Sequence, residues 1–267
     1  MRLKNKVVIV TASTRGIGYA IVKACAKEGA IVYMAARNKD LALEKIKPLL
    51  DTNVNIHFVY NDATKKETYQ SMIKEVIQNE GRVDILVNNF GISNPQKDLD
   101  IESMKYDDFI NTVDINLASV FLSSQAVIPY MKKQESGSII NISSIGGLIP
   151  DIARIGYAVS KDAIIYLSKN MALQLARNKI RVNVVCPGQT ATDAVMNNMS
   201  KDFQDFFLRH TPIQRMAEPE EIANAVVYFA SDESSYTTGQ VLAVSGGFGL
   251  GTPVFADLND LDVSKRH

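Results

Sequence analysis

The fold is decided near the amino end by the stretch Val7-Val8-Ile9-Val10-Thr11-Ala12-Ser13-Thr14-Arg15-Gly16-Ile17-Gly18. An unbroken apolar, β-branched run is typical of a strand buried on both faces, as in a parallel sheet. Gly16 and Gly18 stand where that strand must turn into a helix, and glycines let backbone N–H groups approach a pyrophosphate there. The stretch predicts a nucleotide-binding strand–turn–helix unit. The alternative is an ordinary turn in which the glycines only satisfy backbone geometry.

The rest of the chain repeats this alternation of strand-like and helix-like segments. Such alternation predicts the α/β class, with one Rossmann-type, doubly wound parallel sheet and helices on both faces. We expect a single domain over residues 1–255, with a substrate-covering loop at 189–217, and a polar, flexible tail at 256–267. The expected strands are Val7–Thr11, Ile31–Met34, Asn55–Tyr60, Ile85–Val87, Ser138–Ile142, Arg181–Val185 and Gln240–Val244, and the helices named are Ile17–Glu28, Thr68–Asn79, Phe109–Lys132, Tyr157–Ala176 and Pro219–Ala230.

Composition excludes several classes of function. The 267 residues contain 29 Lys+Arg and 29 Asp+Glu, so nothing in the charge favours binding to nucleic acid or to an anionic membrane. No apolar run reaches the roughly 18 residues of a membrane span, and the amino end lacks the pattern of a signal peptide. The two cysteines, Cys25 and Cys186, form neither a disulfide framework nor a metal set. We therefore expect a cytoplasmic protein without a metal site.

Tyr157 and Lys161 lie four residues apart in an expected helix, so they share one face of it. An ammonium beside a phenol favours the phenolate and is expected to lower the tyrosine pKa from about 10. Such a tyrosine can exchange a proton with an alcohol or a carbonyl. Taken alone, the pair is more often a solvated helix face, so the interpretation needs further motifs.

Those motifs are present, in an order that resembles the short-chain dehydrogenase/reductase family. The resemblance covers residues 1 to about 250. Ala12 replaces the first glycine of the family's turn, Phe90 replaces an alanine, and Ser245 replaces the common aspartate before Gly246-Gly247; neither of the first two changes removes a reacting group. The matching motifs are Thr11…Gly16-Ile17-Gly18, Asn88-Asn89-Phe90-Gly91, Asn116, Ser144, Tyr157…Lys161 and Pro187-Gly188.

The resemblance implies a set of four catalytic residues. Tyr157 is expected to be the acid/base, and Ser144 to orient the substrate oxygen. Lys161 is expected to tune the tyrosine and hold the nicotinamide ribose, while Asn116 anchors a water that links Lys161 to solvent. The expected substrate contacts are Ser144, Gly146 and Tyr157.

The expected cofactor is NADP. In relatives that use NAD an acidic residue ends the second strand, whereas Ala36 and Arg37 stand here and Arg15 lies in the glycine turn. Guanidinium groups near the ribose suit a 2′-phosphate; the alternative is that both arginines are merely solvated. The residues expected to bind the cofactor are Thr11, Ser13, Arg15, Gly16, Ile17, Gly18, Arg37, Asn38, Asp62, Ala63, Asn89, Gly91, Tyr157, Lys161, Pro187, Gly188, Thr190 and Thr192.

Three further stretches resemble clostridial NADP-dependent 7α-hydroxysteroid dehydrogenases: Ser143–Tyr157, Phe203–Pro212 and Phe248–Pro253. They imply a bile acid that is oxidised at its 7α-hydroxyl. Arg209 or His210 is a candidate for meeting the substrate's carboxylate; the alternative is a lid without substrate contact.

Other functions stay open, because one fold supports many chemistries. The first alternative is a 3-oxoacyl-[acyl-carrier-protein] reductase. The second is a non-catalytic NADP-binding regulator, which would typically lack the tyrosine or the lysine. The resemblance also implies a homotetramer.

Overall fold

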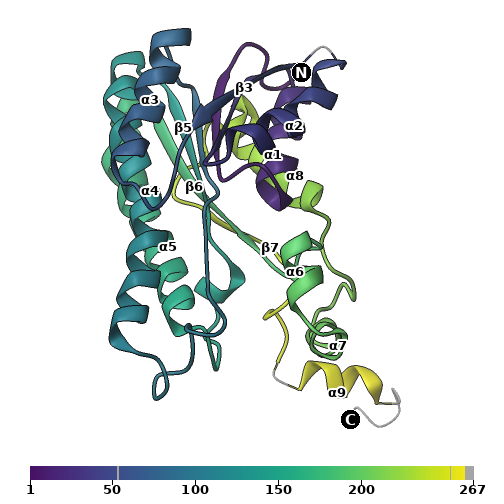
Figure 1. Cartoon of the computed structure of the whole chain (residues 1–267). Coiled ribbons are helices and arrows are strands. Elements are labelled where there is room, and N and C mark those ends of the chain that lie inside the picture. Colours follow the sequence, from purple (N-terminus) through teal and green to yellow (C-terminus); the bar gives the residue numbers. More distant parts are fainter. Residues whose placement is uncertain (53, 253, 262–267) are drawn as a thin grey trace.

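A parallel sheet forms the centre of the molecule (Figure 1). The computed structural model describes residues 1–52, 54–252 and 254–261, and within them the sheet has seven strands in the order β3-β2-β1-β4-β5-β6-β7. Residues 262–267 of the expected tail lie outside the described residues, and so does Pro253, the last residue of the Phe248–Pro253 stretch. The strands are β1 (Val7–Thr11), β2 (Ile31–Ala36), β3 (Asn55–Tyr60), β4 (Ile85–Asn88), β5 (Gly137–Ile142), β6 (Ile180–Pro187) and β7 (Val241–Val244).

Helices cover both faces of the sheet (Figure 1). Alternate residues of β1 point to opposite faces of the sheet. Val8 and Val10 pack against the helices on one face, and Val7 and Ile9 pack against those on the other. The expected doubly wound Rossmann-type sheet is confirmed. The first layer has α1 (Gly16–Lys27), α2 (Lys39–Leu50) and α8 (Pro219–Ala230), and the second has α3 (Glu67–Glu80), α4 (Tyr106–Gln134) and α5 (Ile155–Leu175).

The strand order reverses at β1, which pairs with both β2 and β4. In open α/β sheets, ligands bind in the crevice outside the carboxyl ends of the strands at such a switch point. The glycine turn after β1 and the Asn89–Gly91 segment after β4 are therefore side by side, and Asn89 Nδ2 donates to the carbonyl of Ala12 at 3.0 Å.

The expected strands match the observed ones within two residues at each end, and the named helices match within three. Helix α2 is absent from the expectation. It buries only Ala42 and Ile46 and carries Pro48 inside it, so it lacks a broad apolar stripe.

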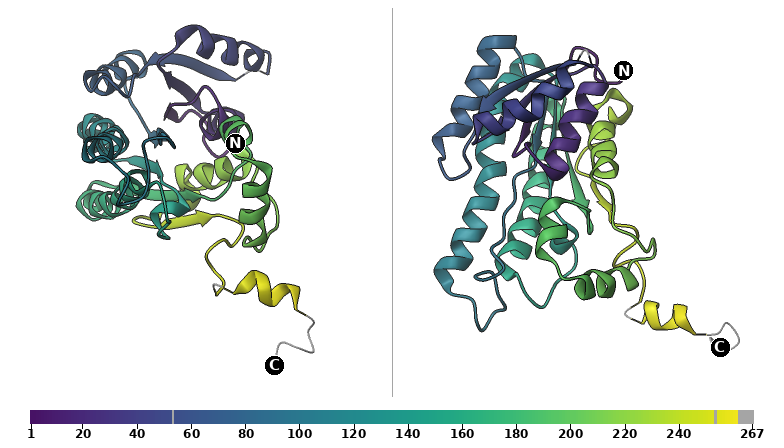
Figure 2. Two further views of the ribbon diagram at one scale, coloured as in Figure 1. Left: turned by 60° about the horizontal axis from the view of Figure 1, so that its bottom comes forward. Right: turned by 45° about the vertical axis from the view of Figure 1, so that its right-hand side comes forward.

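The segment between β6 and α8 holds two short helices, α6 (Asp193–Asn198) and α7 (Lys201–Arg209). The last described element is α9 (Phe255–Asp260), which stands away from the sheet in both views of Figure 2. Three 3₁₀ turns complete the described elements: η1 (Ile145–Gly147), η2 (Ala176–Asn178) and η3 (Asp232–Ser234). Within the described ranges, no helix combines the length and the apolar character that crossing a membrane requires.

Candidate active site

Ser144, Tyr157 and Lys161 lie together beyond the carboxyl end of β5. Ser144 caps η1, where its Oγ accepts a hydrogen bond from the Gly146 amide at 3.1 Å. Tyr157 and Lys161 lie about one turn apart on α5, with Lys161 Nζ 5.5 Å from the centroid of the tyrosine ring. A hydrogen bond joins the side chains of Ser144 and Tyr157. A hydroxyl and a phenol thus meet at one point, an arrangement suited to proton exchange with a substrate oxygen.

The electrostatics of Tyr157 differ from the expectation. Burial raises the pKa of Tyr157 above its ordinary value, while the hydrogen bond with Ser144 and the charge of Arg154 oppose the rise. Cys186 and Asp98 add to it. The expectation of a pKa lowered by Lys161 is wrong for this structure. Spacing shows that a phenol and an amine share a helix face, but it does not show how far that face is removed from water.

Lys161 is itself buried. Burial lowers the pKa of Lys161 to about 8, and its Nζ donates to the carbonyl of Ile142 at 2.9 Å. Gly91 leaves the space that the ammonium occupies, since a Cβ at that position would lie 2.7 Å from Nζ. Within the described part of the chain, this amine is therefore held by a backbone carbonyl and forms no ion pair with a carboxylate.

Asn116 is fully buried on α4, and its side chain is occupied by protein groups. Its Oδ1 accepts from the Ile92 amide at 2.9 Å, and its Nδ2 donates to the Ile92 carbonyl at 2.9 Å and to Ser160 Oγ at 3.1 Å. Its backbone carbonyl accepts from Ser119 Oγ at 2.7 Å. Asn116 therefore ties the segment after β4 to α5.

The glycine turn has the geometry that an anion site requires. Gly16, Ile17 and Gly18 open α1, whose cap residue Arg15 makes no side-chain capping bond, so backbone amides at this helix end are left for a phosphate. A Cβ at Gly18 would lie 2.6 Å from the Ala12 carbonyl oxygen, so this helix start packs directly on the turn. These features fit the pyrophosphate of a dinucleotide.

Thr11 and Ser13 are buried, and their hydroxyls bond to the protein. Thr11 Oγ1 accepts from the Asn89 amide at 3.0 Å, and Ser13 Oγ donates to the Val10 carbonyl at 2.8 Å. Between them Ala12 adopts φ +51°, in the left-handed region. This is where the family has glycine, so the alanine carries backbone strain.

The end of β2 presents exposed polar residues. Arg37 follows the strand, and Asn38 caps α2 by accepting from the Leu41 amide at 3.0 Å. Arg15 is also exposed. No acidic residue stands at the end of β2, whose last residue is Ala36.

Asp62, expected near the adenine, lies just after β3, and the half-buried Ala63 packs on the core beneath. Burial tends to raise the pKa of Asp62, but hydrogen bonds from Thr64 and the charge of Arg37 outweigh it, so the pKa is lowered. Its Oδ1 accepts from the Thr64 amide at 3.0 Å and from Thr64 Oγ1 at 2.8 Å.

The segment after β6 forms the opposite wall. Pro187 ends the strand, and the Gly188 amide donates to the Val244 carbonyl at 2.9 Å. Thr190 Oγ1 donates to the Gly188 carbonyl at 3.0 Å, and Thr192 caps α6. A Cβ at Gly16 would lie 3.2 Å from Thr192 Cγ2, so this wall approaches the glycine turn. The expected cofactor residues thus lie at or after the carboxyl ends of β1 to β4 and β6, apart from Tyr157 and Lys161 on α5.

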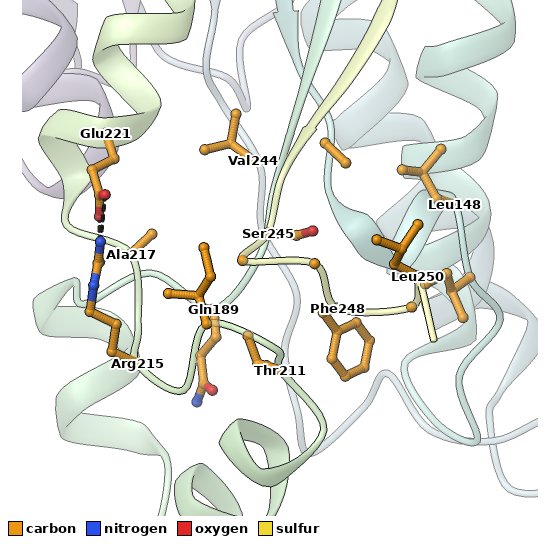
Figure 3. A pocket seen from close by; sticks show the side chains of 16 residues that line it. Leu148, Gln189, Thr211, Arg215, Ala217, Glu221, Val244, Ser245, Phe248 and Leu250 are labelled. Carbon is orange, nitrogen blue, oxygen red and sulfur yellow. Dashed lines mark hydrogen bonds and ion pairs between the residues drawn. The ribbon is translucent and has the colours of Figure 1, made fainter. Parts of the chain in front are cut away.

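A pocket of about 600 Å³ opens beside this region (Figure 3). Leu148 and Leu250 lie at one end, and the Arg215–Glu221 ion pair lies at the other. The side-chain oxygen of Gln189 is buried here without a hydrogen-bond partner among the described residues. Neither Ser144 nor Tyr157 lines the pocket, so it adjoins the proton-transfer residues without including them.

Helix α7 contacts Phe248 and helix α9. Phe207 stacks on Phe248 with ring centroids 4.2 Å apart. Arg209, a candidate for meeting a substrate carboxylate, instead pairs with Asp257 at 2.8 Å and Asp260 at 3.2 Å on α9. His210 lies with its ring 5.2 Å from that of Phe206.

Sequence reasoning missed Asp98. It lies in the loop between β4 and α4 and accepts from the backbone amides of Gly156 and Tyr157. No local motif marks it, because its partners are almost sixty residues away along the chain. A single acidic residue in a loop cannot be recognised from the sequence, because its role appears only when the folded chain places it against the start of α5.

The fold and the site together define a class of protein: an oxidoreductase that binds a nicotinamide cofactor at the carboxyl edge of a parallel sheet and acts on a CH–OH group. Among the described residues, no cluster of His, Cys, Asp and Glu is placed to hold a metal ion.

Comparison with known proteins gives the family. A family model described as enoyl-(acyl carrier protein) reductase matches residues 11–249. A protein of Clostridium sardiniense named 7α-hydroxysteroid dehydrogenase is 50% identical over 96% of this chain and 98% of its own length. The chain belongs to the short-chain dehydrogenase/reductase family, as its motifs predict.

Two further relatives bear on the substrate. A solved structure of 7α-hydroxysteroid dehydrogenase with NADH and 7-oxoglycochenodeoxycholic acid has a TM-score of 0.87 and 34% identity, covering 92% of this chain and 95% of that one. A 3-oxoacyl-[acyl-carrier-protein] reductase of Thermotoga maritima is 36% identical over 92% of this chain and 99% of its own length. The reductase is thus a more distant relative than the Clostridium sardiniense protein.

Proposed function

We propose that the protein is an NADP-dependent 7α-hydroxysteroid dehydrogenase that interconverts the 7α-hydroxyl and the 7-ketone of bile acids. The observation that carries this proposal is the 50% identity, over nearly the whole of both chains, to the Clostridium sardiniense protein of that name. The three stretches that resemble this class are supporting features, because each contributes to the pocket of Figure 3: Leu148 from the first, Thr211 from the second, and Phe248 and Leu250 from the third.

Tyr157 is the proposed acid/base. In oxidation its phenolate takes the proton of the substrate hydroxyl, and in reduction its phenol returns a proton to the oxygen. Ser144, already hydrogen-bonded to Tyr157, holds the same oxygen. A bound nicotinamide supplies or accepts the hydride.

Lys161 and Asn116 support this centre. Lys161 is proposed to hold the nicotinamide ribose, because its buried amine lies beside Gly91 and the tyrosine ring. Asn116 fixes the segment that carries Gly91 through its two bonds to Ile92. Both the side chain and the backbone carbonyl of Asn116 already accept hydrogen bonds from the protein, so the proposed relay water would share one of these oxygens with its present donor.

The proposed cofactor is NADP. Arg15 and Arg37 are exposed on the turns after β1 and β2, and Ala36 ends β2 where a carboxylate would repel a 2′-phosphate. The remaining expected residues, from Thr11 to Thr192, are proposed to contact the cofactor as their resemblance implies.

The experiment is a spectrophotometric assay of cofactor reduction with bile acids that differ only in their 3-, 7- and 12-hydroxyls. Cholate and chenodeoxycholate should be oxidised with NADP, whereas a bile acid without a 7α-hydroxyl should not. Acetoacetyl thioester with NADPH is the competing substrate. Faster turnover of the thioester would overturn the proposal in favour of the acyl reductase.

Assembly and domain organisation are part of the proposal. Exposed apolar side chains on the long helices, Phe121 on α4 and Tyr166 and Leu173 on α5, favour burial against further copies in a homotetramer. Leu242 on the edge strand β7 is also partly exposed. We further propose a cytoplasmic protein with one domain over residues 1–255. Sedimentation as a monomer at micromolar concentration would refute the assembly.

A further inference from the structure

Asp98 is the one buried residue of the loop 91–105, all of which is described. Its exposed fraction is 1%. No lysine or arginine among the described residues forms an ion pair with it. A buried carboxylate of this kind needs hydrogen-bond donors, and the donors here come from the helix that carries Tyr157 and Lys161.

Helix α5 begins without a cap of its own. The residue at its cap position, Arg154, adopts φ +57° and makes no side-chain capping bond. The amides at a helix start have no partner within the helix, so each needs an outside acceptor.

Asp98 and its neighbour supply those acceptors across the fold. Asp98 Oδ1 accepts from the Gly156 amide at 2.8 Å, and Oδ2 accepts from the Tyr157 amide at 3.1 Å. The Leu99 carbonyl accepts from the Ile155 amide at 3.2 Å. The first three amides of α5 are thus bound by two consecutive loop residues, and the first bond within the helix runs from the Ala158 amide to the Arg154 carbonyl.

The packing around this contact is close. A Cβ at Gly156 would lie 3.2 Å from Asp98 Oδ1 and 3.0 Å from Met104 Cε, so glycine lets the helix start sit against the loop. Ser93 Oγ donates to Asp98 Oδ2 at 2.8 Å, which fixes the carboxylate from the loop side.

We propose that Asp98 is a positioning residue for Tyr157: it caps the catalytic helix from another part of the chain and sets both the place and the electrostatic surroundings of the phenol. A carboxylate at a helix start is also favoured by the helix dipole. The inference rests on the proposed role of Tyr157 as acid/base.

The surroundings of Tyr157 give this contact a second effect. Four charged or titratable groups face the tyrosine: Asp98 from the loop, Arg154 from the cap position of α5, Lys161 from α5, and Cys186 from β6. The charge of Asp98 raises the pKa of Tyr157. Removing that charge should therefore lower the pKa, which loss of stability alone would not do.

The test compares Asp98→Asn with a matched variant, Asp84→Asn. Asp84 is also a buried carboxylate and accepts from the Val7 amide at 2.8 Å, but it lies at the amino end of β4, away from the site. In Asp98→Asn we expect kcat to fall about ten- to a hundred-fold by misplacement of the phenol, with NADP affinity unchanged. The acid limb of the pH profile for oxidation, which follows deprotonation of Tyr157, should move to lower pH. Asp84→Asn should lose thermal stability without moving that limb.

A substrate-independent readout separates this inference from the proposed function. NMR titration of protein labelled at the tyrosine Cζ, with the Tyr157 signal assigned from Tyr157→Phe, follows the phenol directly. A downward shift in Asp98→Asn supports the inference even if bile acids prove not to be substrates. An unchanged Tyr157 titration together with wild-type kcat would overturn it.

If Asp98→Asn does not fold, Ser93→Ala is a second variant that tests the same inference. It keeps both capping bonds but removes a donor from the carboxylate, so the charge of Asp98 is less compensated. The Tyr157 titration should then move in the opposite direction, upward. No movement in this variant would overturn the electrostatic role.

Discussion

Replacing Lys161 by methionine should make the protein more stable and inactive. Lys161 is 2% exposed, and burial lowers its pKa from 10.5 to about 8. The difference of 2.5 units corresponds to about 3 kcal/mol of unfavourable free energy in keeping the amine charged inside the fold. Methionine has a similar shape without the charge, but it leaves the Ile142 carbonyl unpaired, at a cost of about 1–2 kcal/mol. The net expectation at pH 7 is a gain of roughly 1–2 kcal/mol.

The gain should depend on pH in a defined direction. Below pH 8 the amine is charged in both the folded and the unfolded protein, so the whole penalty is present. Between about pH 8 and 10.5 the folded protein has lost the proton and the unfolded chain has kept it. The unfolded state then binds more protons, so wild-type stability from this group rises with pH. The advantage of Lys161→Met should therefore shrink across this window.

Urea unfolding at pH 7 and pH 10, for wild type and Lys161→Met, measures the effect. Lys74→Met, at an exposed position on α3, is the control and should change the unfolding free energy little. A Lys161→Met protein that is less stable than wild type at pH 7, or whose advantage does not change with pH, would refute the reasoning. Whatever its stability, Lys161→Met should lose turnover if Lys161 has its proposed role.

Four further predictions concern single positions. Gly91→Ala should lower kcat about tenfold, because its Cβ displaces Lys161 Nζ, yet leave the melting temperature nearly unchanged; wild-type kinetics would contradict this. Tyr69→Phe should raise the unfolding free energy by about 1 kcal/mol in urea titrations, since the Tyr69 hydroxyl is buried without a partner among the described residues. Ala12→Gly should also stabilise by about 1 kcal/mol, by relieving a left-handed alanine, and a destabilised variant would argue against strain. Arg37→Asp should raise the KM for NADP at least about tenfold and lower that for NAD in steady-state assays, while unchanged preference would show that Arg37 is merely solvated.

Much of the sheet was predictable because buried parallel strands such as Val7–Val10 are read directly from apolar runs. Helix α2 was not, since Pro48 and a thin apolar stripe hide its period. The segment containing α6 and α7 was expected only as a loop. Short helices there are held by caps and by contacts with remote residues, such as Phe207 on Phe248, which spacing does not reveal.

The candidate site likewise has features that the sequence predicted and features that it did not. Motif spacing was enough to expect Ser144, Tyr157 and Lys161 in one place, and the fold brings them there. The direction of the tyrosine's pKa was wrong, because desolvation depends on everything packed around α5. Asp98 was missed because its partners are remote in sequence.

The bonds of Asn116 have a consequence for how this protein can change over evolution or in the laboratory. Aspartate at this position would keep the shape of the side chain but place a second acceptor against the Ile92 carbonyl. Leucine would fill the same volume but leave the Ile92 amide and carbonyl without their hydrogen-bond partner. Nearly every substitution therefore disturbs the β4–α4 segment and α5 together. Engineering of substrate range should leave position 116 fixed and vary α7 and α9, which meet through exposed ion pairs that are easily exchanged.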